Sequence, residues 1–321
     1  MNELRTRSPR VAAAGVYIVD VLGRPVSSLP RGQTAHLLDE IRITVAGTGG
    51  GTAVDLARLG ANVLAAGAIG TDTIGDFLLA VLAQEGIESR LVRKPGVQTS
   101  ATILPIHPDG TRPAWHVRGA NATISLEDMP WDALADCDVV HLGGITALGP
   151  LDGEPAAEVL KRAHDHGALT TADCLGVKHP DALAFCQACL PHVDLFMPNE
   201  DEAMTITGAP DATAAALALR DLGAKCAIVK CGPNGCVVAD ADGPRAIPGF
   251  AVDVVDTTGC GDAFCAGVIV ATCGGWPIDR AALLGNATGA LTARGLGSDA
   301  GARDLDEALR FMSEREPATA A

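Results

Sequence analysis

Residues 256–264 read Asp-Thr-Thr-Gly-Cys-Gly-Asp-Ala-Phe. They follow the apolar segment Ala251 to Val255, which predicts a strand, and Asp262 to Val270 predicts a buried helix of small residues. Gly259 and Gly261 therefore fall at the N-terminus of a helix. Glycines leave backbone N–H groups uncovered, and the helix dipole adds partial positive charge, so this turn can hold an anion such as phosphate.

A carboxylate beside an anion cradle needs a chemical reason. Asp262 would be repelled by a bound phosphate, so we expect it to accept the proton of an attacking hydroxyl. The structural alternative for an isolated G-x-G-D is an aspartate that caps the helix. The nine residues together favour the catalytic interpretation. They resemble the D-T-T-G-A-G-D-x-F signature of the ribokinase (PfkB-type) family of sugar and nucleoside kinases, with Cys260 in place of alanine.

This resemblance implies roles for the whole turn. Asp262 would be the general base, and Gly259, Cys260 and Gly261 would hold the transferred phosphoryl group. Thr258 would lie on the nucleotide side. Cofactors implied are ATP and Mg²⁺, with K⁺ as a further candidate.

Composition limits the functional classes. The 321 residues carry a formal net charge of −15, which argues against a nucleic-acid or anionic-membrane surface because both need clustered Lys and Arg. Ten cysteines are scattered through the chain and favour free thiols in a reducing cytosol, so we expect a cytoplasmic protein. The pair Cys186 and Cys189, with His192 nearby, is the alternative of a metal site, but no second pair stands at zinc spacing.

The apolar run Val11 to Leu22 follows three arginines and superficially resembles a signal peptide. Asp20 interrupts it, which better fits a first strand, Val11 to Val19, that ends at a functional aspartate. No stretch is long and apolar enough to span a bilayer. We expect residues 1–9 and the tail from Pro317 to be disordered.

Residues Asn62 to Ala68 predict a strand, and from there strands and helices alternate through most of the chain, most clearly from Asp138 onward. This pattern predicts one α/β domain over residues 1–321: a doubly wound, mostly parallel sheet sandwiched by helices. Two segments, near 20–46 and 97–118, are rich in short strands and do not fit the alternation. We expect them to form a small β-sheet lid, with a hairpin turn at Asp109-Gly110.

Glycines 47 and 49–51 follow a probable strand and open a helix, so a dinucleotide-binding fingerprint has to be considered. The spacing fails, because G-x-G-x-x-G would need glycine at Thr52 or Val54. The chain also lacks a P-loop. A nicotinamide-dependent oxidoreductase is therefore a disfavoured alternative, and the retention of Asp262 disfavours a second one, a non-catalytic sugar-binding protein.

The resemblance to the ribokinase family extends from about residue 11 to 312 and implies further site residues. Asp20, Gly47, Gly51 and Asn121 would bind the acceptor, although Gly51 stands where the family has a sugar-binding asparagine. On the nucleotide side the implied residues are Asn199, Lys230, Gly232, Gly235 and Asn286.

Two metal sites are also implied. Asn199 and Glu202, in an N-x-x-E motif, would hold Mg²⁺ through waters, while the alternative is ordinary acidic decoration of a helix start. Asp256 and the carbonyl of Gly295 would bind a monovalent cation. The family arginine that faces phosphate is missing, and Lys178 is the nearby candidate to replace it.

We therefore expect ATP-dependent phosphorylation of a hydroxyl, a primary CH2OH group, on a sugar or sugar-like acceptor, with a nucleoside kinase of the same fold as the alternative. The predicted lid would expose an apolar face and two strand edges. Family members often cover these by pairing lids, so we expect a homodimer, with candidate contacts at Ile103, Leu104, Ile106 and Trp115.

Overall fold

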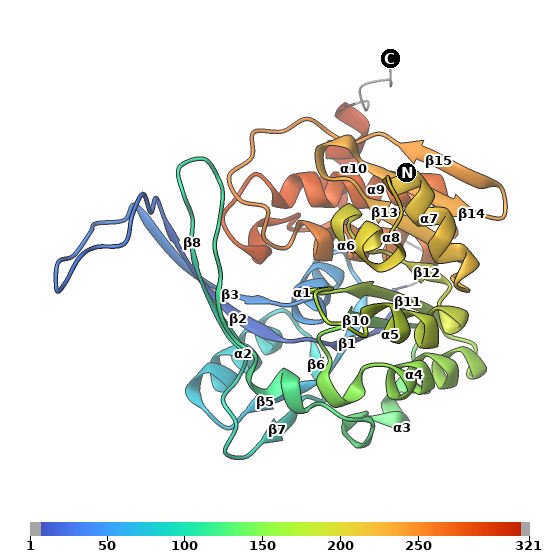
Figure 1. Ribbon diagram of the computed structural model, residues 1–321, viewed down its shortest axis with the longest axis horizontal. Coiled ribbons are helices and arrows are strands. Elements are labelled where there is room, and N and C mark those ends of the chain that lie inside the picture. Colours follow the sequence, from blue (N-terminus) through green and yellow to red (C-terminus); the bar gives the residue numbers. More distant parts are fainter. Residues whose placement is uncertain (1–7, 316–321) are drawn as a thin grey trace.

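A nine-stranded sheet forms the centre of the molecule in the computed structural model, which describes residues 8–315 (Figure 1). The strand order is β15-β14-β13-β12-β11-β10-β1-β4-β6. Strands β13 to β6 in this order run parallel, and β14 and β15 add an antiparallel edge. The strands are β1 Arg10–Gly15, β4 Asn62–Ala66, β6 Glu88–Ser89, β10 Val139–Ile145, β11 Leu169–Cys174, β12 Leu195–Phe196, β13 Cys226–Lys230, β14 Cys236–Asp240 and β15 Gly243–Ile247.

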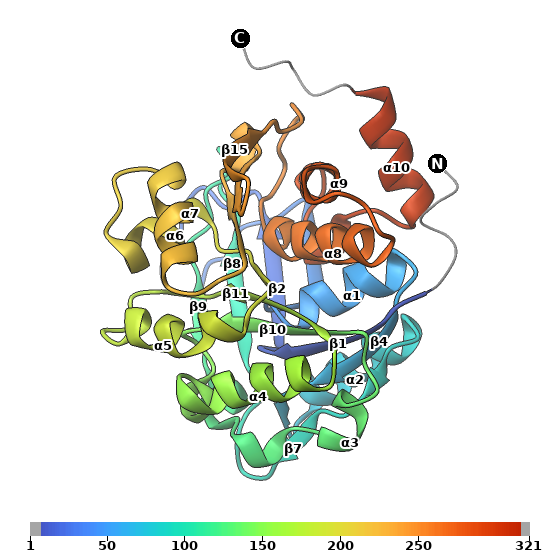
Figure 2. The same cartoon turned by 90° about the vertical axis from the view of Figure 1, so that its right-hand side faces the viewer.

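Helices cover both faces of this sheet, as Figure 2 shows for α4 and α5 on one side and α1 and α8 on the other. Successive residues of β1 alternate between the two cores: Ala12 and Ala14 pack into one, Val11 and Ala13 into the other. The first core receives α3 Trp131–Leu134, α4 Glu154–Asp165, α5 Ala182–Cys189, α6 Glu200–Thr207 and α7 Ala212–Asp221. The second receives α1 Gly50–Arg58, α2 Thr73–Gln84, α8 Cys260–Cys273, α9 Ile278–Thr292 and α10 Leu305–Glu314. The predicted doubly wound α/β fold is confirmed.

The strand order changes direction between β1 and β10. From β1 the chain first builds β4 and β6 on one side and then β10 to β13 on the other. Ligands of such sheets bind outside the carboxyl ends of the strands at this point. Close packing there requires glycine, since a Cβ on Gly143 would lie 2.5 Å from the carbonyl carbon of Thr48.

A separate four-stranded sheet, in the order β3-β2-β8-β9, projects from the body of the molecule (Figure 1). It consists of β2 Ile18–Arg24, β3 Glu40–Ala46, β8 Ala101–Pro105 and β9 Trp115–Val117. Strands β2 and β8 are parallel, while β2–β3 and β8–β9 are antiparallel. A further pair, β5 Ala68–Gly70 and β7 Val92–Lys94, forms a small sheet of its own.

The two faces of the four-stranded sheet differ. On the inner face Leu22, Leu104 and Ile106 are buried against Leu296. The outer face exposes large apolar side chains, among them Ile41, Ile43, Ile103 and Trp115. Of the four residues predicted to form an exposed contact surface, only Ile103 and Trp115 therefore face outward, because strand residues alternate in direction.

The single strand predicted from Val11 to Val19 is wrong. The chain turns at Val16 and Tyr17 and passes from β1 of the large sheet into β2 of the small one. The Asn121 side chain fixes this corner, accepting a hydrogen bond from the Tyr17 N–H at 3.2 Å and donating to the Tyr17 carbonyl at 2.9 Å. Asp20 therefore lies within β2 and not at the end of β1.

Two other predicted strands need correction. Residues 251–255 form no strand: Val252 and Val254 line a cavity, and the Val255 N–H donates to the carbonyl of Ala293 at 2.8 Å. This segment lies beyond the edge strand β15, so its backbone finds a helix end as partner. The predicted strand from Asn62 to Ala68 divides at Gly67, where a Cβ would lie 2.6 Å from the Gly15 carbonyl oxygen.

None of the ten cysteines, all of which lie within the described residues, forms a disulfide bond, and Cys186 and Cys189 belong to no metal-like cluster of the described residues. Within residues 8–315, no helix has the length and hydrophobicity needed to cross a bilayer. The predicted disordered ends fall almost entirely on residues 1–7 and 316–321, outside the described residues.

Candidate active site

The glycine turn before α8 forms the centre of the site. Gly259 is the N-cap of α8 with φ 79°, and a Cβ there would lie 2.5 Å from Ser298 Cα, so both conformation and space demand glycine. No carbonyl of the described residues accepts from the N–H groups of Gly261 or Asp262. These donors face a cavity of about 680 Å³ that Thr258, Gly259, Cys260, Gly261 and Asp262 all line. The turn is therefore open to an anion.

Asp262 lines this cavity, and its pKa is higher than that of an ordinary aspartate. Burial raises its pKa to about 8, and nearby Asp55, Asp20 and Glu202 act in the same direction, while Lys230 opposes them. Its carboxylate rests over Gly51, where an added Cβ would overlap with it. A carboxyl group with a pKa near neutrality is suited to exchange a proton during turnover.

Lys230 brings a buried positive charge to the C-terminal end of β13. Its Nζ lies 4.0 Å from Asp173 Oδ2 and 3.8 Å from Cys265 Sγ. A Cβ on Gly261 would lie only 3.2 Å from this Nζ, so the ammonium group is close to the first turn of α8. Burial alone would lower the pKa of Lys230, but Cys265, Asp173, Glu202 and Asp262 together raise it, and the charge is kept.

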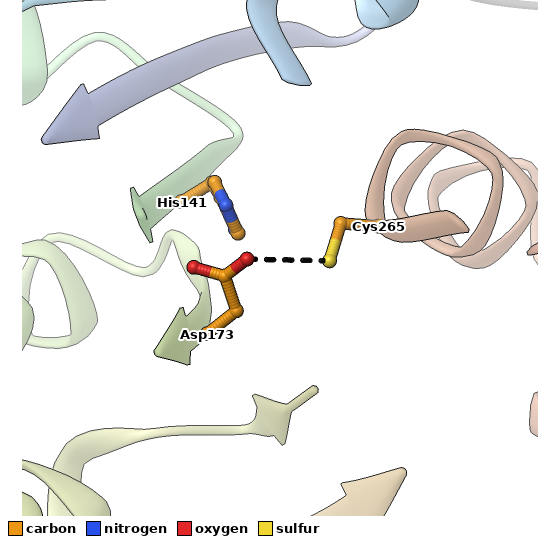
Figure 3. Close-up of side chains that lie close together, drawn as sticks. All are labelled: His141, Asp173 and Cys265. Atoms are coloured by element: carbon orange, nitrogen blue, oxygen red, sulfur yellow. Dashed lines mark hydrogen bonds between the residues drawn. The ribbon is translucent and has the colours of Figure 1, made fainter. Parts of the chain in front are cut away.

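His141, Asp173 and Cys265 point toward one another (Figure 3). Their ligand atoms lie within 4.8 Å of each other, which is compatible with a metal site. The Lys230 ammonium, however, already contacts two of the three, and a cation beside it would be repelled. Burial and Lys230 lower the pKa of His141 to about 3, so its ring is neutral. We assign the cluster to charge balance around Lys230.

Asn199 and Glu202 line the same cavity at the start of α6. They form a capping box: Asn199 Oδ1 accepts from the Glu202 N–H at 2.8 Å, and Glu202 Oε2 accepts from the Asn199 N–H at 2.9 Å. Burial raises the pKa of Glu202, and Lys230 counteracts it. Both side chains therefore have a structural role at the start of α6, which was the alternative considered for this motif. Both also line the cavity.

The far end of the cavity is a pocket between β13, β14 and α9. Gly232 and Gly235 line it with positive φ angles of 56° and 86°, and a Cβ on Gly235 would lie 2.5 Å from the Gly249 nitrogen. Asn286, from α9, donates to the Pro248 carbonyl at 3.0 Å. The predicted nucleotide-side residues therefore line the same cavity as the α8 turn.

A second cavity, of about 450 Å³, adjoins the first on the side of the small sheet. The two share Asp20, Arg112 and Leu175 in their linings. Burial raises the pKa of Asp20 to about 6, whereas Thr102 and Arg112 lower it. Arg112 comes from the β8–β9 hairpin loop, and its Nε lies 3.4 Å from Asp256 Oδ1. The two cavities therefore meet at Asp20.

Comparison with known proteins agrees with this geometry. Residues 9–304 match the family described as pfkB family carbohydrate kinase. The chain belongs to the pfkB carbohydrate kinase family.

Named relatives span most of the chain. It is 30% identical to an ATP-dependent ribose-1-phosphate kinase of Halopiger xanaduensis over 316 residues, 95% of this chain and 99% of that protein. A ribokinase of Haemophilus influenzae is 28% identical over 84% of this chain and 88% of its own. A ribokinase-like structure from E. coli, in complex with ATP and Mg²⁺, superposes with a TM-score of 0.82 at 21% identity, covering 96% of this chain and all of that one. The protein is thus an ATP-dependent carbohydrate kinase with a ribokinase-like fold, and the oxidoreductase alternative finds no support.

Four predicted site residues of this pfkB kinase lie outside both cavity linings: Gly51, Asn121, Asp256 and Gly295. Asn121 holds the corner at Tyr17, and Gly51 supports the Asp262 carboxylate. Asp256 is buried, and its carboxylate accepts from the N–H groups of Thr258 at 3.0 Å and Gly297 at 2.9 Å. The geometry therefore gives Gly51, Asn121 and Asp256 contacts that position other groups. The ligand roles predicted for these three residues and for Gly295 stay predictions.

Sequence reasoning missed several residues of the kinase site. The β8–β9 hairpin brings Arg112, His116 and Arg118 to the second cavity, and no sequence motif identifies them. His141 gives no sequence signal either, because only the parallel pairing of β10 with β11 brings it to Asp173. Lys178 is exposed and lines neither cavity, so the positive charge facing the site comes from Lys230 and Arg112.

Proposed function

We propose that this kinase transfers the γ-phosphoryl group of ATP to a hydroxyl, a primary CH2OH group, of a sugar or sugar-like acceptor, with Asp262 as the general base. One observation carries the proposal. The Asp262 carboxylate lies beside the unpaired N–H groups of the first α8 turn, in a cavity that joins a second cavity at Asp20. A base, an anion cradle and room for two substrates are therefore adjacent.

In this proposal, backbone N–H groups and the buried Lys230 ammonium bind the phosphate groups of ATP. The N–H groups of Gly259 to Asp262 would bind γ-phosphoryl oxygens, and Lys230 would offset the charge that develops on them. Asn199 and Glu202 would hold Mg²⁺ through waters, which fits side chains whose direct bonds serve the helix cap. Mg²⁺ held there would supply positive charge that offsets the negative charge of the phosphate groups.

On the acceptor side, Asp20 and Gly47 would align the hydroxyl for transfer. Asp20 lines both cavities and can accept hydrogen bonds from neighbouring hydroxyls. Gly47 has φ 84°, and a Cβ there would lie 2.6 Å from the Val16 carbonyl oxygen, so its backbone approaches the ligand space without a side chain. Orientation of this kind supplies much of the rate in phosphoryl transfer.

The small sheet would act as a lid, formed by about residues 20–46 and 97–118. Its hairpin loop reaches the α8 turn through the ion pair between Arg112 and Asp256. Its inner face is tied down further by the Ser298 hydroxyl, which donates to the Val45 carbonyl at 2.7 Å. In this position the sheet would exclude water, which would otherwise compete as acceptor.

We also propose a homodimer formed through the outer face of this sheet. Ile41, Ile43, Ile103 and Trp115 are each about half exposed or more, at 66%, 52%, 54% and 49%. An apolar face of this kind on a projecting sheet is stabilised when a second copy covers it. A cytoplasmic location is proposed as well, since none of the ten cysteines forms a disulfide bond.

A monovalent cation near Asp256 and the Gly295 carbonyl is a further proposal, derived from the family resemblance. Asp256 is buried at the base of the α8 turn, and its carboxylate is bonded to the Thr258 N–H. A cation bound to this carboxylate would therefore place positive charge close to the anion cradle. We expect turnover to increase when K⁺ replaces tetramethylammonium in the buffer. Equal rates in K⁺, Na⁺ and tetramethylammonium would exclude this site.

The whole proposal is tested by binding and turnover with one panel. Thermal-shift measurements with Mg·ATP, NAD, sugars and nucleosides identify ligands, and ADP release identifies acceptors. We expect Mg·ATP to stabilise the protein and at least one sugar to be phosphorylated. Turnover of nucleosides alone would make it a nucleoside kinase, stabilisation by NAD and not ATP would overturn the proposal, and sugar binding without turnover would indicate a binding protein.

A further inference from the structure

The second cavity has a composition that the proposed transfer does not explain. Side chains of the hairpin strands β8 and β9 form one wall, and residues 146–147 and 175–179 form the other. Its volume of about 450 Å³ is within the usual range for small-molecule sites. Asp20 is the only carboxylate in its lining, within the part of the chain that the structure describes.

Four of the thirteen residues in this lining have basic side chains. They are Arg112, His116, Arg118 and His179. The chain as a whole carries a formal charge of −15, so the cavity is a local exception to a negative surface. A cleft of one sign within a low-dielectric wall concentrates ligands of the opposite charge.

The two arginines differ in their partners. Arg112 lies near Asp256, but its buried Nε has no hydrogen-bond partner among the described residues. Arg118 forms no ion pair with any described carboxylate, and it faces the cavity from the end of β9. Both guanidinium groups thus keep donors that a bound anion can use, and arginine binds phosphate or carboxylate through two parallel hydrogen bonds.

The two histidines of the lining are held by different contacts. His116 Nδ1 lies 3.1 Å from Thr102 Oγ1, which fixes the ring, and burial together with Arg118 lowers the pKa of His116. His179 packs against Phe185 with ring centroids 5.0 Å apart. The permanent positive charge of the cavity therefore comes from the arginines.

We propose that the acceptor is an anionic sugar, one that carries a phosphate or a carboxylate group, and that Arg118 binds this group at the end of the cavity away from Asp20. This inference rests on the proposed function and specifies its substrate class. The reacting hydroxyl is held where the cavities meet, at Asp20, and the anionic group lies toward β9. Arg112, shared by both cavities, faces the phosphoryl group in transfer as well as the acceptor.

The test compares matched acceptors at saturating Mg·ATP, each of which has a free primary CH2OH group: ribose with ribose 1-phosphate, fructose with fructose 1-phosphate and fructose 6-phosphate, and glucose with gluconate. We expect kcat/KM for at least one phosphate or acid to exceed that of its neutral partner by about tenfold or more, as a charge-assisted bidentate contact allows. The phosphate and acid arms show which anion is used.

The variant Arg118→Gln keeps length and polarity and removes the charge. It should lower kcat/KM for the anionic acceptor about tenfold or more, mainly through KM, and leave that for the neutral partner unchanged. Arg93→Gln is the matched control, because Arg93 is exposed on β7, pairs with Asp76 and lines neither cavity. Circular dichroism checks that both variants are folded.

The outcomes separate the two proposals. Preference for neutral sugars, or an equal loss for both acceptors in Arg118→Gln, overturns the anionic acceptor and leaves the kinase intact. If no sugar is turned over, calorimetry with the same sugar phosphates and acids decides, and absence of binding to the wild type overturns the inference. Failure of a non-hydrolysable ATP analogue with Mg²⁺ to bind counts instead against the proposed function.

Discussion

The two cavities that meet at Asp20 are built in different ways. The larger is formed by helix N-termini, strand ends and glycines, so that backbone groups and one buried lysine face the space for a ligand. The smaller is formed by side chains of a projecting hairpin and two loops. The first design depends on the backbone and on the sheet, whereas the second can be changed residue by residue without disturbing the sheet.

The larger cavity offers the strongest test of this comparison. Asp262→Asn keeps the shape of the side chain and removes the base. We expect kcat to fall by about a hundredfold or more, since general-base contributions are typically 10² to 10⁴, while Mg·ATP affinity is retained. Steady-state kinetics and calorimetry measure the two effects.

Asp221→Asn is the control for this variant, because Asp221 is exposed at the end of α7 and lines neither cavity. It should behave as the wild type. Near-normal turnover in Asp262→Asn would show that another group accepts the proton, and the general base would have to be sought outside the α8 turn.

Lys230→Met sharpens the electrostatic part of the comparison. Since Asp262 must be ionised to act as a base and its pKa is raised to about 8, the rate should rise with pH up to about 8, with a limiting slope of about tenfold per unit below it. Lys230 opposes that rise of the pKa, so its removal should shift the profile to higher pH and lower kcat at pH 7 by about tenfold or more.

Lys178→Met is the matched control, since Lys178 is exposed and lines neither cavity. Its pH profile should be that of the wild type. If Lys178→Met moved the profile and Lys230→Met did not, the missing arginine would be replaced by Lys178 after all. Thermal unfolding of both variants separates loss of charge from loss of folding.

The same difference explains what could be predicted from the sequence. The α8 turn was predictable because glycine, a helix start and a carboxylate must follow one another in the chain to form it. Arg112, Arg118 and His141 were not, since the pairing of β8 with β9 and of β10 with β11 places them. The strand predicted across Val16 and Tyr17 failed for a related reason: a distant side chain, Asn121, holds the corner.

A smaller effect is expected at Glu202, where a capping role and a metal role coincide. Glu202→Gln keeps the hydrogen bond to the Asn199 N–H but removes the charge. We expect the Mg²⁺ concentration for half-maximal activity to rise severalfold, with KM for the acceptor nearly unchanged. Asp201→Asn, at an exposed position in the same first turn, is the control. Identical Mg²⁺ titrations for the wild type and Glu202→Gln would limit Glu202 to the cap.

The smallest effect on chemistry, and the one that concerns the smaller cavity, is expected on the outer face of the small sheet. Trp115 is 49% exposed there and pairs across the sheet with Ile103, while its neighbour His116 lines the acceptor cavity. A carboxylate at this position opposes burial of the face by a second copy. Trp115→Asp should therefore shift the protein from dimer toward monomer and raise KM for the acceptor severalfold, while the affinity for Mg·ATP is unchanged.

Light scattering at micromolar concentration and steady-state kinetics measure these changes. Leu217→Asp is the control for adding a charge at an exposed apolar position, since Leu217 is 38% exposed on α7, away from both cavities. A wild type that is monomeric and fully active would remove the dimer. A dimer that Trp115→Asp leaves intact would place the interface elsewhere. If Trp115→Asp instead weakened Mg·ATP binding as much as acceptor binding, the two cavities would not be separable, because a change confined to the projecting sheet would have reached the backbone-built half of the site.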